Sequence, residues 1–243
     1  MTIGIAVAVL LASALPGRTV AASHANLVPG PNRYMQTNLL SNLSGKAAFT
    51  DANLKNPWGM AFAPGGPFWI SDNNSGFSTV CEANGQFDFA VQIPLPPGSK
   101  SSFSAPTGLV YNQTGDFSVG GTGPALFIFS TEDGTIAGWN GGLATLTANL
   151  SGKGAIYKGL AMGSTASGNF LYATDFHNGK IQVFDKNYSP TTLAGSFTDA
   201  SIPAGFAPFG ITNIQNQLFV TYAMQDAQKV NGQPGSGNGF VDI

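Results

Sequence analysis

Residues 171–184 read LYATDFHNGKIQVF, and the same plan recurs as LFIFSTEDGTIAGW at residues 126–139 and FWISDNNSGFSTVC at residues 68–81. Each copy contains a run of β-favouring residues, a polar turn closed by glycine and a second alternating run. Such a stretch predicts a β-hairpin, because glycine readily adopts the positive φ that a tight turn needs. The three copies align without a gap, so we expect three equivalent hairpins.

A second motif precedes each hairpin and sets the repeat length. It consists of a residue that is often proline, then any residue, a glycine and an apolar residue. The four anchor glycines, at intervals of 49, 51 and 51 residues, are Gly59, Gly108, Gly159 and Gly210. Four short strands per repeat of about 50 residues, without helical periodicity, are typical of a β-propeller blade. We therefore predict an all-β propeller of four-stranded antiparallel blades.

The third repeat illustrates the expected strands. We predict them at residues 159–162, 170–174, 180–185 and 192–197, in that order from the anchor. A further similarity connects the first and fourth repeats, because FTDA occurs at residues 49–52 and again at residues 197–200.

Composition excludes several classes of protein. Charged residues make up 9% of the chain, against roughly 25% in ordinary globular proteins, which argues against helical bundles and coiled coils. A hydrophobic fraction of 43% and a net charge of −2 argue against disorder. The ten basic residues are scattered singly, so a nucleic-acid partner is not expected.

The first 25 residues resemble an export signal. Residues 3–15 form an apolar run too short to span a bilayer, and small residues suited to cleavage follow it. No Lys or Arg precedes the run, so a mis-assigned start or a buried helix is the alternative. We predict a signal peptide at residues 1–25, a mature chain of residues 26–243 without a membrane span, and a periplasmic, extracellular or cell-surface location.

These anchors and hairpins resemble the NHL class of six-bladed propellers. NPWGMAF, ALFIFSTEDGTIAGWN, LYATDFHNGKIQVFD, APFGITN and GNGFVD together also resemble an uncharacterised family of exported bacterial proteins, often found with the PEP-CTERM sorting system. The resemblance implies the propeller fold but no activity, because fold-level likeness does not transfer chemistry.

Members of that family continue for about two blades beyond the fourth anchor. This chain ends within the third strand of its fourth unit, so the resemblance implies an N-terminal part with about four of six blades. On the same reasoning we expect residues 36–41 to form an outer strand that completes the last blade.

Candidates for chemistry are few. His177 lies in a polar turn and Cys81 is the sole cysteine, so a zinc site or a Ser-His-Asp arrangement lacks most of its members. We expect His177 to be a solvated turn residue and Cys81 a small packed side chain, and we name no catalytic residue.

Calcium is the alternative metal. Oxygen donors in equivalent hairpin turns of several blades could converge to supply the six to eight ligands that calcium prefers. Asx turns explain the same residues without a metal. The binding candidates in these turns are Asp72, Asn73, Asp133 and Asp175, together with Asn74 and Glu132, and the calcium alternative rests on Asp72 and Asp175.

Propeller lactonases, which resemble this chain in blade plan, place metal ligands at or beside the residue before each anchor glycine. The residues at those positions here, none of them a carboxylate, are Trp58, Thr107, Lys158 and Phe209. Only Asn56 and Asn213 nearby offer an amide oxygen. The comparison argues against a lactonase-type metal centre.

Two function classes remain. The first is an exported, non-catalytic propeller that binds a protein, a glycan or a small molecule. The alternative is a metal-dependent hydrolase of the lactonase type, or a quinone-type oxidoreductase, acting in the central channel. The lack of a histidine cluster, and of carboxylates at the anchor positions, favours the first class.

Overall fold

The computed structural model describes residues 35–195 and 197–243, and residues 37–243 form one compact unit. The signal peptide predicted at residues 1–25 lies outside the described residues. No helix among the described residues is long and apolar enough to cross a membrane.

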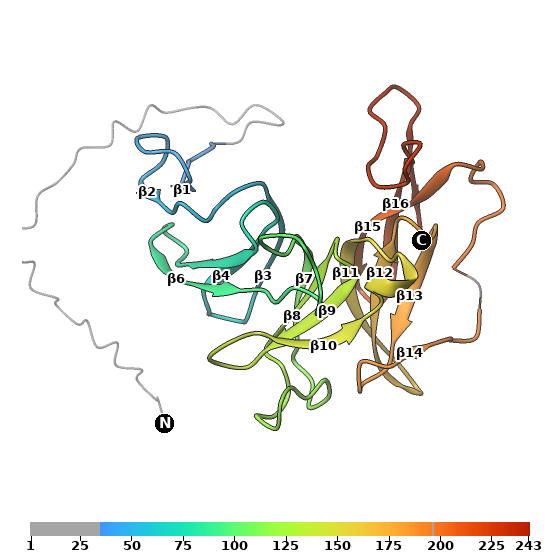
Figure 1. Cartoon of the computed structure of the whole chain (residues 1–243), viewed down its shortest axis with the longest axis horizontal. Helices are drawn as coiled ribbons and strands as arrows, with labels where there is room; N and C mark the ends of the chain where they lie inside the picture. The colour runs from blue at the N-terminus through green and yellow to red at the C-terminus, as the bar shows by residue number, and fades with distance from the viewer. Residues whose placement is uncertain (1–34, 196) are drawn as a thin grey trace, which may run out of the picture. The chain divides into compact units, whose positions relative to one another are not determined.

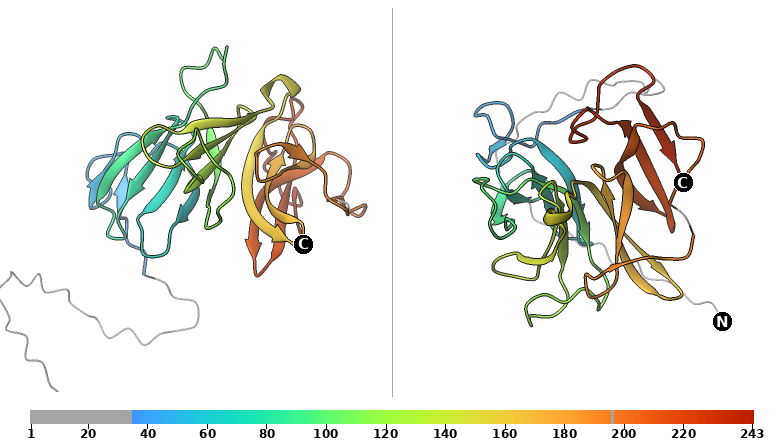
Figure 2. Two further views of the ribbon diagram at one scale, coloured as in Figure 1. Left: turned by 90° about the horizontal axis from the view of Figure 1, so that it is seen from below. Right: turned by 45° about the vertical axis from the view of Figure 1, so that its right-hand side comes forward.

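Four antiparallel sheets succeed one another along the chain, as Figures 1 and 2 show. Blade 1 consists of β3 (Pro57–Phe62), β4 (Phe68–Asp72), β5 (Phe77–Cys81) and β6 (Phe87–Gln92). Blade 2 consists of β7 (Pro106–Tyr111), β8 (Phe127–Thr131), β9 (Thr135–Trp139) and β10 (Thr145–Asn149). Blade 3 consists of β11 (Tyr157–Thr165), β12 (Gly168–Asp175), β13 (Lys180–Phe184) and β14 (Pro190–Thr191). Blade 4 has three strands, β15 (Phe206–Ile214), β16 (Gln217–Met224) and β17 (Gly239–Asp242). The propeller of four-stranded antiparallel blades is confirmed.

The first strand of each blade lies beside the first strand of the next, in the order β3, β7, β11, β15. These inner strands come so close at the anchor glycines that no side chain fits between them. A Cβ added at Gly59 would lie 2.4 Å from the carbonyl oxygen of Thr107, and one added at Gly108 would lie 2.2 Å from the backbone nitrogen of Leu160. Backbone thus packs directly on backbone at the anchors of blades 1, 2 and 3, which explains why the motif recurs.

Each anchor is also a β-bulge. The pairing of the first two strands shifts register between Pro57 and Met60, and the same shift occurs in the other three blades. A hydroxyl group on the second strand bonds the bulge, since Ser130 Oγ accepts from Gly108 N at 3.1 Å and Thr221 Oγ1 accepts from Gly210 N at 2.8 Å. Bulges redirect side chains, so the residue before each glycine departs from the regular alternation of its strand.

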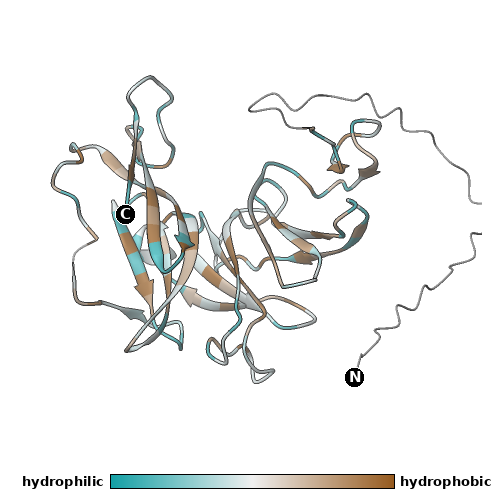
Figure 3. Cartoon of the chain, turned by 180° about the vertical axis from the view of Figure 1, so that it is seen from behind, coloured by the Kyte–Doolittle hydropathy of each residue, from teal (hydrophilic) through white to brown (hydrophobic). Residues whose placement is uncertain are grey.

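Hydrophobic faces of neighbouring blades pack against each other. Trp69 and Val80 of blade 1 meet Phe127 and Phe129 of blade 2, and the Trp69 and Phe127 rings stack with centroids 4.2 Å apart. Similar clusters join blade 2 to blade 3 and blade 3 to blade 4. Figure 3 shows the hydrophobic residues distributed along the strands of all four sheets. Aromatic side chains of the strands thus contribute to the layers between blades.

The hairpin of blade 2 is one residue shorter than its counterparts. Asp72 pairs with Phe77 and Asp175 with Lys180, which leaves four turn residues in blades 1 and 3. In blade 2, Ser130 pairs with Ile136, so Thr131 and Thr135 flank a turn of only three residues. The gapless alignment of the three copies is therefore wrong before this turn, where Phe127 rather than Leu126 corresponds to Phe68. The turn glycines still match, so they do not reveal the difference in turn length.

Two strand predictions also need correction. The outer strand of blade 3 is β14, Pro190–Thr191, rather than residues 192–197. Within residues 36–41 the only strand is β1 (Leu40–Ser41), which pairs in parallel with β2 (Phe49–Thr50) as a separate small sheet. In both places the strand is only two residues long, too short for alternating hydrophobicity to indicate it.

The steric role of the anchor glycine can be tested with Gly108→Ala. Its Cβ would collide with the backbone of β11, so we expect the free energy of unfolding to fall by about 3 kcal/mol, the upper end of the range for overpacking. Gly115→Ala is the matched control, because a Cβ there meets nothing within 4 Å, and it should change stability by less than about 0.5 kcal/mol. Urea unfolding of both variants measures the difference, and equal effects would contradict the close-approach argument.

Candidate functional site

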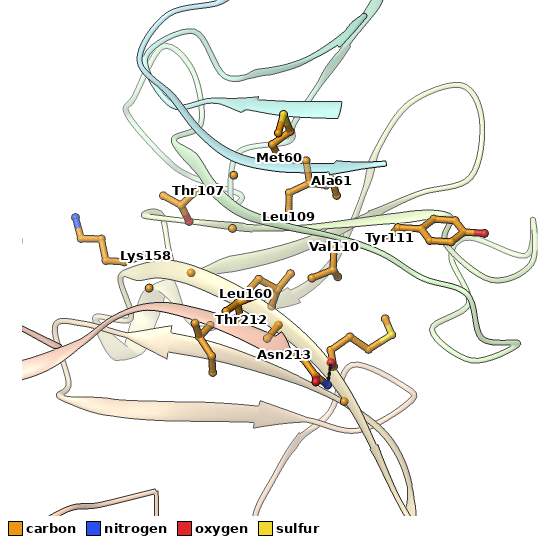
Figure 4. A pocket seen from close by; sticks show the side chains of 18 of the residues that line it. Met60, Ala61, Thr107, Leu109, Val110, Tyr111, Lys158, Leu160, Thr212 and Asn213 are labelled. Atoms are coloured by element: carbon orange, nitrogen blue, oxygen red, sulfur yellow. Dashed lines mark hydrogen bonds between the residues drawn. The ribbon is translucent and has the colours of Figure 1, made fainter. Parts of the chain in front are cut away.

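The four inner strands line a groove of about 820 Å³. Figure 4 shows Met60 and Ala61 on β3, Leu109 and Val110 on β7, and other lining side chains on β11 and β15. Each inner strand is the edge of its sheet, so one side of its backbone has no neighbouring strand in its own blade. The groove therefore offers main-chain groups as well as side chains to a ligand.

The two ends of the groove differ in chemistry. The ends of the inner strands that follow the anchors contribute amide and hydroxyl groups, from Gln113, Thr114, Ser164, Asn213, Gln215 and Asn216. Asn213 Nδ2 donates to the carbonyl oxygen of Met162 at 2.8 Å, drawn as a dashed line in Figure 4. The anchor end carries Trp58, Thr107, Lys158 and Phe209, the residues that precede the glycines. The groove thus runs from a polar, uncharged mouth to an aromatic end.

Lys158 ties the four blades together at the aromatic end. Its ammonium forms an ion pair with Glu132 of blade 2 and lies 5.4 Å from the ring centroid of Trp58 in blade 1. It also lies 5.7 Å from the rings of Phe176 in blade 3 and Phe209 in blade 4. Cation–π attraction at these distances stabilises the buried ammonium. Lys158 is the one charged residue among those lining the groove, and Glu132 neutralises it.

Asn73, a predicted binding residue, belongs to the same network. Its Nδ2 donates to Glu132 Oε2 at 2.9 Å and to the carbonyl oxygen of Pro106 at 3.4 Å. Asn56 Nδ2 donates in turn to Asn73 Oδ1 at 3.2 Å. Both asparagine side chains therefore hold Glu132 in place beside Lys158.

Asp133 and Asp175 have a shared local role. Asp133 Oδ2 accepts from Ala105 N at 2.8 Å, and Asp175 Oδ1 accepts from Ile156 N at 3.2 Å. Each carboxylate thus fastens its own hairpin to the residue just before the inner strand of the same blade. Burial raises the pKa of Asp133. These two contacts span 28 and 19 positions, so they differ from the local Asx turns expected from the sequence.

The structure does not bring Asp72 and Asp175 together. Asp72 accepts from Thr79 within blade 1, whereas Asp175 bonds to Ile156 and Asn178 within blade 3. Among residues 35–195 and 197–243 no three carboxylate, histidine or cysteine side chains are grouped as metal ligands. Calcium at Asp72 and Asp175 stays a prediction.

His177 and Cys81 lie away from the groove lining. The carbonyl oxygen of His177 accepts from Gln225 Nε2 at 3.4 Å, which connects its turn to the long loop of blade 4. Cys81 is buried at the end of β5, and burial, with smaller effects of Glu82 and Asp72, raises the pKa of its thiol. A thiol held protonated in this way is a poor nucleophile.

Sequence reasoning missed the pairing of Lys158 with Glu132. From the sequence alone, Lys158 is an anchor residue that cannot bind a metal, and Glu132 is an oxygen donor in a turn. The two are 26 positions apart on different blades, so no local pattern connects them. A lone lysine at an otherwise uncharged anchor position was the available signal.

No protein-family model matches the chain. Uncharacterized protein R648 of Acanthamoeba polyphaga mimivirus is 32% identical over 232 residues, which cover 88% of this chain and 56% of R648. Uncharacterized protein L690 of the same virus is 29% identical over 215 residues, covering 81% of this chain and 55% of L690. The chain thus spans about half the length of these curated relatives.

Solved structures show similar folds. Virginiamycin B lyase from Staphylococcus aureus matches with a TM-score of 0.48 and 17% identity, over 72% of this chain and 52% of that one. The computationally designed Ika4 protein matches with a TM-score of 0.43 and 15% identity, over 85% of this chain and 98% of that one. The propeller assignment rests on the sheets of the chain itself.

The ion pair at the aromatic end can be tested by a double-mutant cycle. Glu132→Gln leaves the Lys158 ammonium, whose side chain is 1% exposed, without its counter-charge, so we expect a loss of about 2–4 kcal/mol in stability. Lys158→Met should cost less, because the Glu132 side chain is 23% exposed. The double variant should fall short of the sum by about 1–3 kcal/mol.

Urea unfolding supplies the four free energies, with Lys153→Met as a control at an exposed lysine. Strict additivity would show that the two charges do not interact.

Proposed function

We propose that this chain is an exported, non-catalytic β-propeller that binds an uncharged ligand in the groove between its inner strands. The observation that carries the proposal is the lining of the groove, where no carboxylate is present and the single cation is neutralised by Glu132. Acid–base or metal-assisted chemistry needs titratable or ligating groups beside the ligand. The described lining offers hydrogen-bonding and apolar groups instead.

The lining indicates what such a ligand looks like. Met60, Leu109 and Met162 provide apolar contact along the groove, and methionine adapts its shape to irregular partners. Amide and hydroxyl groups at the mouth, such as Asn213 and Gln215, suit hydroxyl or amide groups on the ligand. A neutral glycan, an uncharged peptide segment or a neutral small molecule meets these requirements, whereas an ion would enter without a counter-charge.

Export and ancestry belong to the same proposal. The apolar run at residues 3–15, followed by small residues, supports removal of a leader and a periplasmic, extracellular or cell-surface location. The resemblance of the anchors to NHL-like exported bacterial proteins supports a scaffold with variable loops. The proposal requires no cofactor.

The test uses the 243-residue chain in binding assays with neutral glycans and uncharged peptides, followed by titration calorimetry of each hit. Thr212→Trp fills the groove from β15, where Thr212 is exposed, and should weaken binding at least tenfold. Thr145→Trp makes the same change on the outer strand β10, away from the groove, and should leave affinity unchanged.

Three results would contradict the proposal. They are hits confined to charged compounds, equal affinity in both tryptophan variants, and turnover of a lactone panel in the presence of calcium. The last result would favour the metal-dependent hydrolase instead.

A further inference from the structure

Blade 1 contains a second buried polar cluster, on the face that points away from blade 2. Side chains alternate along a strand, so Trp69 and Val80 face blade 2 while Asp72 and Thr79 face the opposite side. There Thr79 Oγ1 lies 2.6 Å from Asp72 Oδ2 and 2.5 Å from Asp51 Oδ2. Asp51, which follows β2, is 7% exposed, and Asp72 and Thr79 are fully buried.

These two contacts need two protons, but a threonine hydroxyl supplies one. Thr79 donates its proton to one carboxylate, so the other carboxyl must carry a proton and donate to Thr79 Oγ1. Two ionised carboxylates would face the same hydroxyl oxygen with one contact repulsive. The geometry therefore describes a carboxylate pair that shares one proton.

Among the described residues, no cationic side chain forms an ion pair with Asp51 or Asp72. The ion pair of Lys158 with Glu132 is the only salt bridge that the described residues form, and it lies at the groove. The charges of Glu82, Asp72 and Asp51 all act on the Cys81 thiol, which lies on the same strand as Thr79. Asp72 Oδ1 is buried without a hydrogen-bond partner.

The pKa of Asp72 is consistent with this arrangement. Burial raises it to about 7, with a further increase from the charge of Asp51, while the bonds from Thr79 lower it. Because the pKa of Asp72 in the folded protein lies above its ordinary value of 3.8, the stabilising proton is bound at low pH. The contribution of the pair therefore falls as pH rises from about 4 through 7.

Asp51 also holds a piece of chain onto blade 1. Residues 37–54, which we term the N-terminal segment, include β1 and β2 and reach this face through Asp51. Leu39 packs on the turn at Gly85, where an added Cβ would lie 2.6 Å from the Leu39 Cβ. Ser75 Oγ donates to the carbonyl oxygen of Asn53 at 2.6 Å. Between Leu39 and Asn53, Asp51 makes the buried polar contact with Thr79.

We propose that Asp51, Thr79 and Asp72 form a proton-operated latch that keeps the N-terminal segment on blade 1 and releases it when the pair loses its proton. Release uncovers the face of β5 that carries Cys81, which is 5% exposed when the segment is docked. The inference is independent of the groove and of the ligand proposed for it.

The lone cysteine provides the measurement. Cys81 is the sole thiol of the chain, so a thiol reagent such as a maleimide reports on this face alone. Thiols react faster at high pH in any case, so wild type must be compared with a variant whose latch stays closed.

Asp51→Asn is that variant. Asp51 Oδ1 accepts from Asn53 N at 3.0 Å, and the introduced amide retains this oxygen while its NH₂ group donates to Thr79 Oγ1. Thr79 can then donate to Asp72, so every bond persists with only one carboxylate. We expect the ratio of wild-type to D51N labelling rates to be near one at pH 6 and to rise at least tenfold by pH 8.5.

A constant ratio across this pH range would overturn the latch. Thr79→Val, which removes the bridging hydroxyl but keeps both carboxylates, should release the segment at lower pH than wild type; unchanged labelling would overturn the role of Thr79. Hydrogen exchange of residues 37–54 and of β12 separates local release from global unfolding. Equal loss of protection in both regions of the wild type would also contradict the proposal.

Discussion

The close approach of inner strands at the anchor glycines is the constraint on which the rest of the structure depends. Backbone of one blade contacts backbone of the next at Gly59, Gly108 and Gly159, which sets the spacing of the sheets. That spacing brings Trp69 onto Phe127 and leaves the groove between the strand edges. Packing between blades, the bulge and the groove therefore all follow from the absence of a side chain at one position per repeat.

Much of the fold could be predicted because its determinants are local and repeated. Turn glycines, alternating strands and the anchor motif each lie within a few residues, and four copies reinforce one another. What escaped prediction depends on length or distance. The shorter turn of blade 2 still contains a glycine, Gly134, so the sequence does not reveal that one residue is missing. Strand β14 has two residues, too few to show alternating hydrophobicity.

The candidate site was less predictable than the fold, for a physical reason. The sequence suggests the acidic turn residues as binding or metal-ligating groups. In the structure, Asp133 and Asp175 accept hydrogen bonds from backbone N–H groups of their own blades. The groups at the aromatic end of the groove are one lysine and the rings of Trp58 and Phe209, which come from three different repeats and meet only when the blades pack together. Asp51 was marked by the repeated FTDA sequence, yet its partners Thr79 and Asp72 become apparent only in three dimensions.

The bulge at the anchors assigns two roles to two adjacent residues: the glycine contacts the neighbouring blade in blades 1, 2 and 3, and the residue before it contributes its side chain to the end of the groove. In those three blades the glycine is fixed by this contact, whereas the residue before the anchor glycine, such as Thr107 or Phe209, differs in every repeat. Selection can therefore change the interior chemistry one blade at a time without altering the spacing of the scaffold. Homologous propellers that keep the glycines and exchange the preceding residues would diverge in ligand while retaining the same frame.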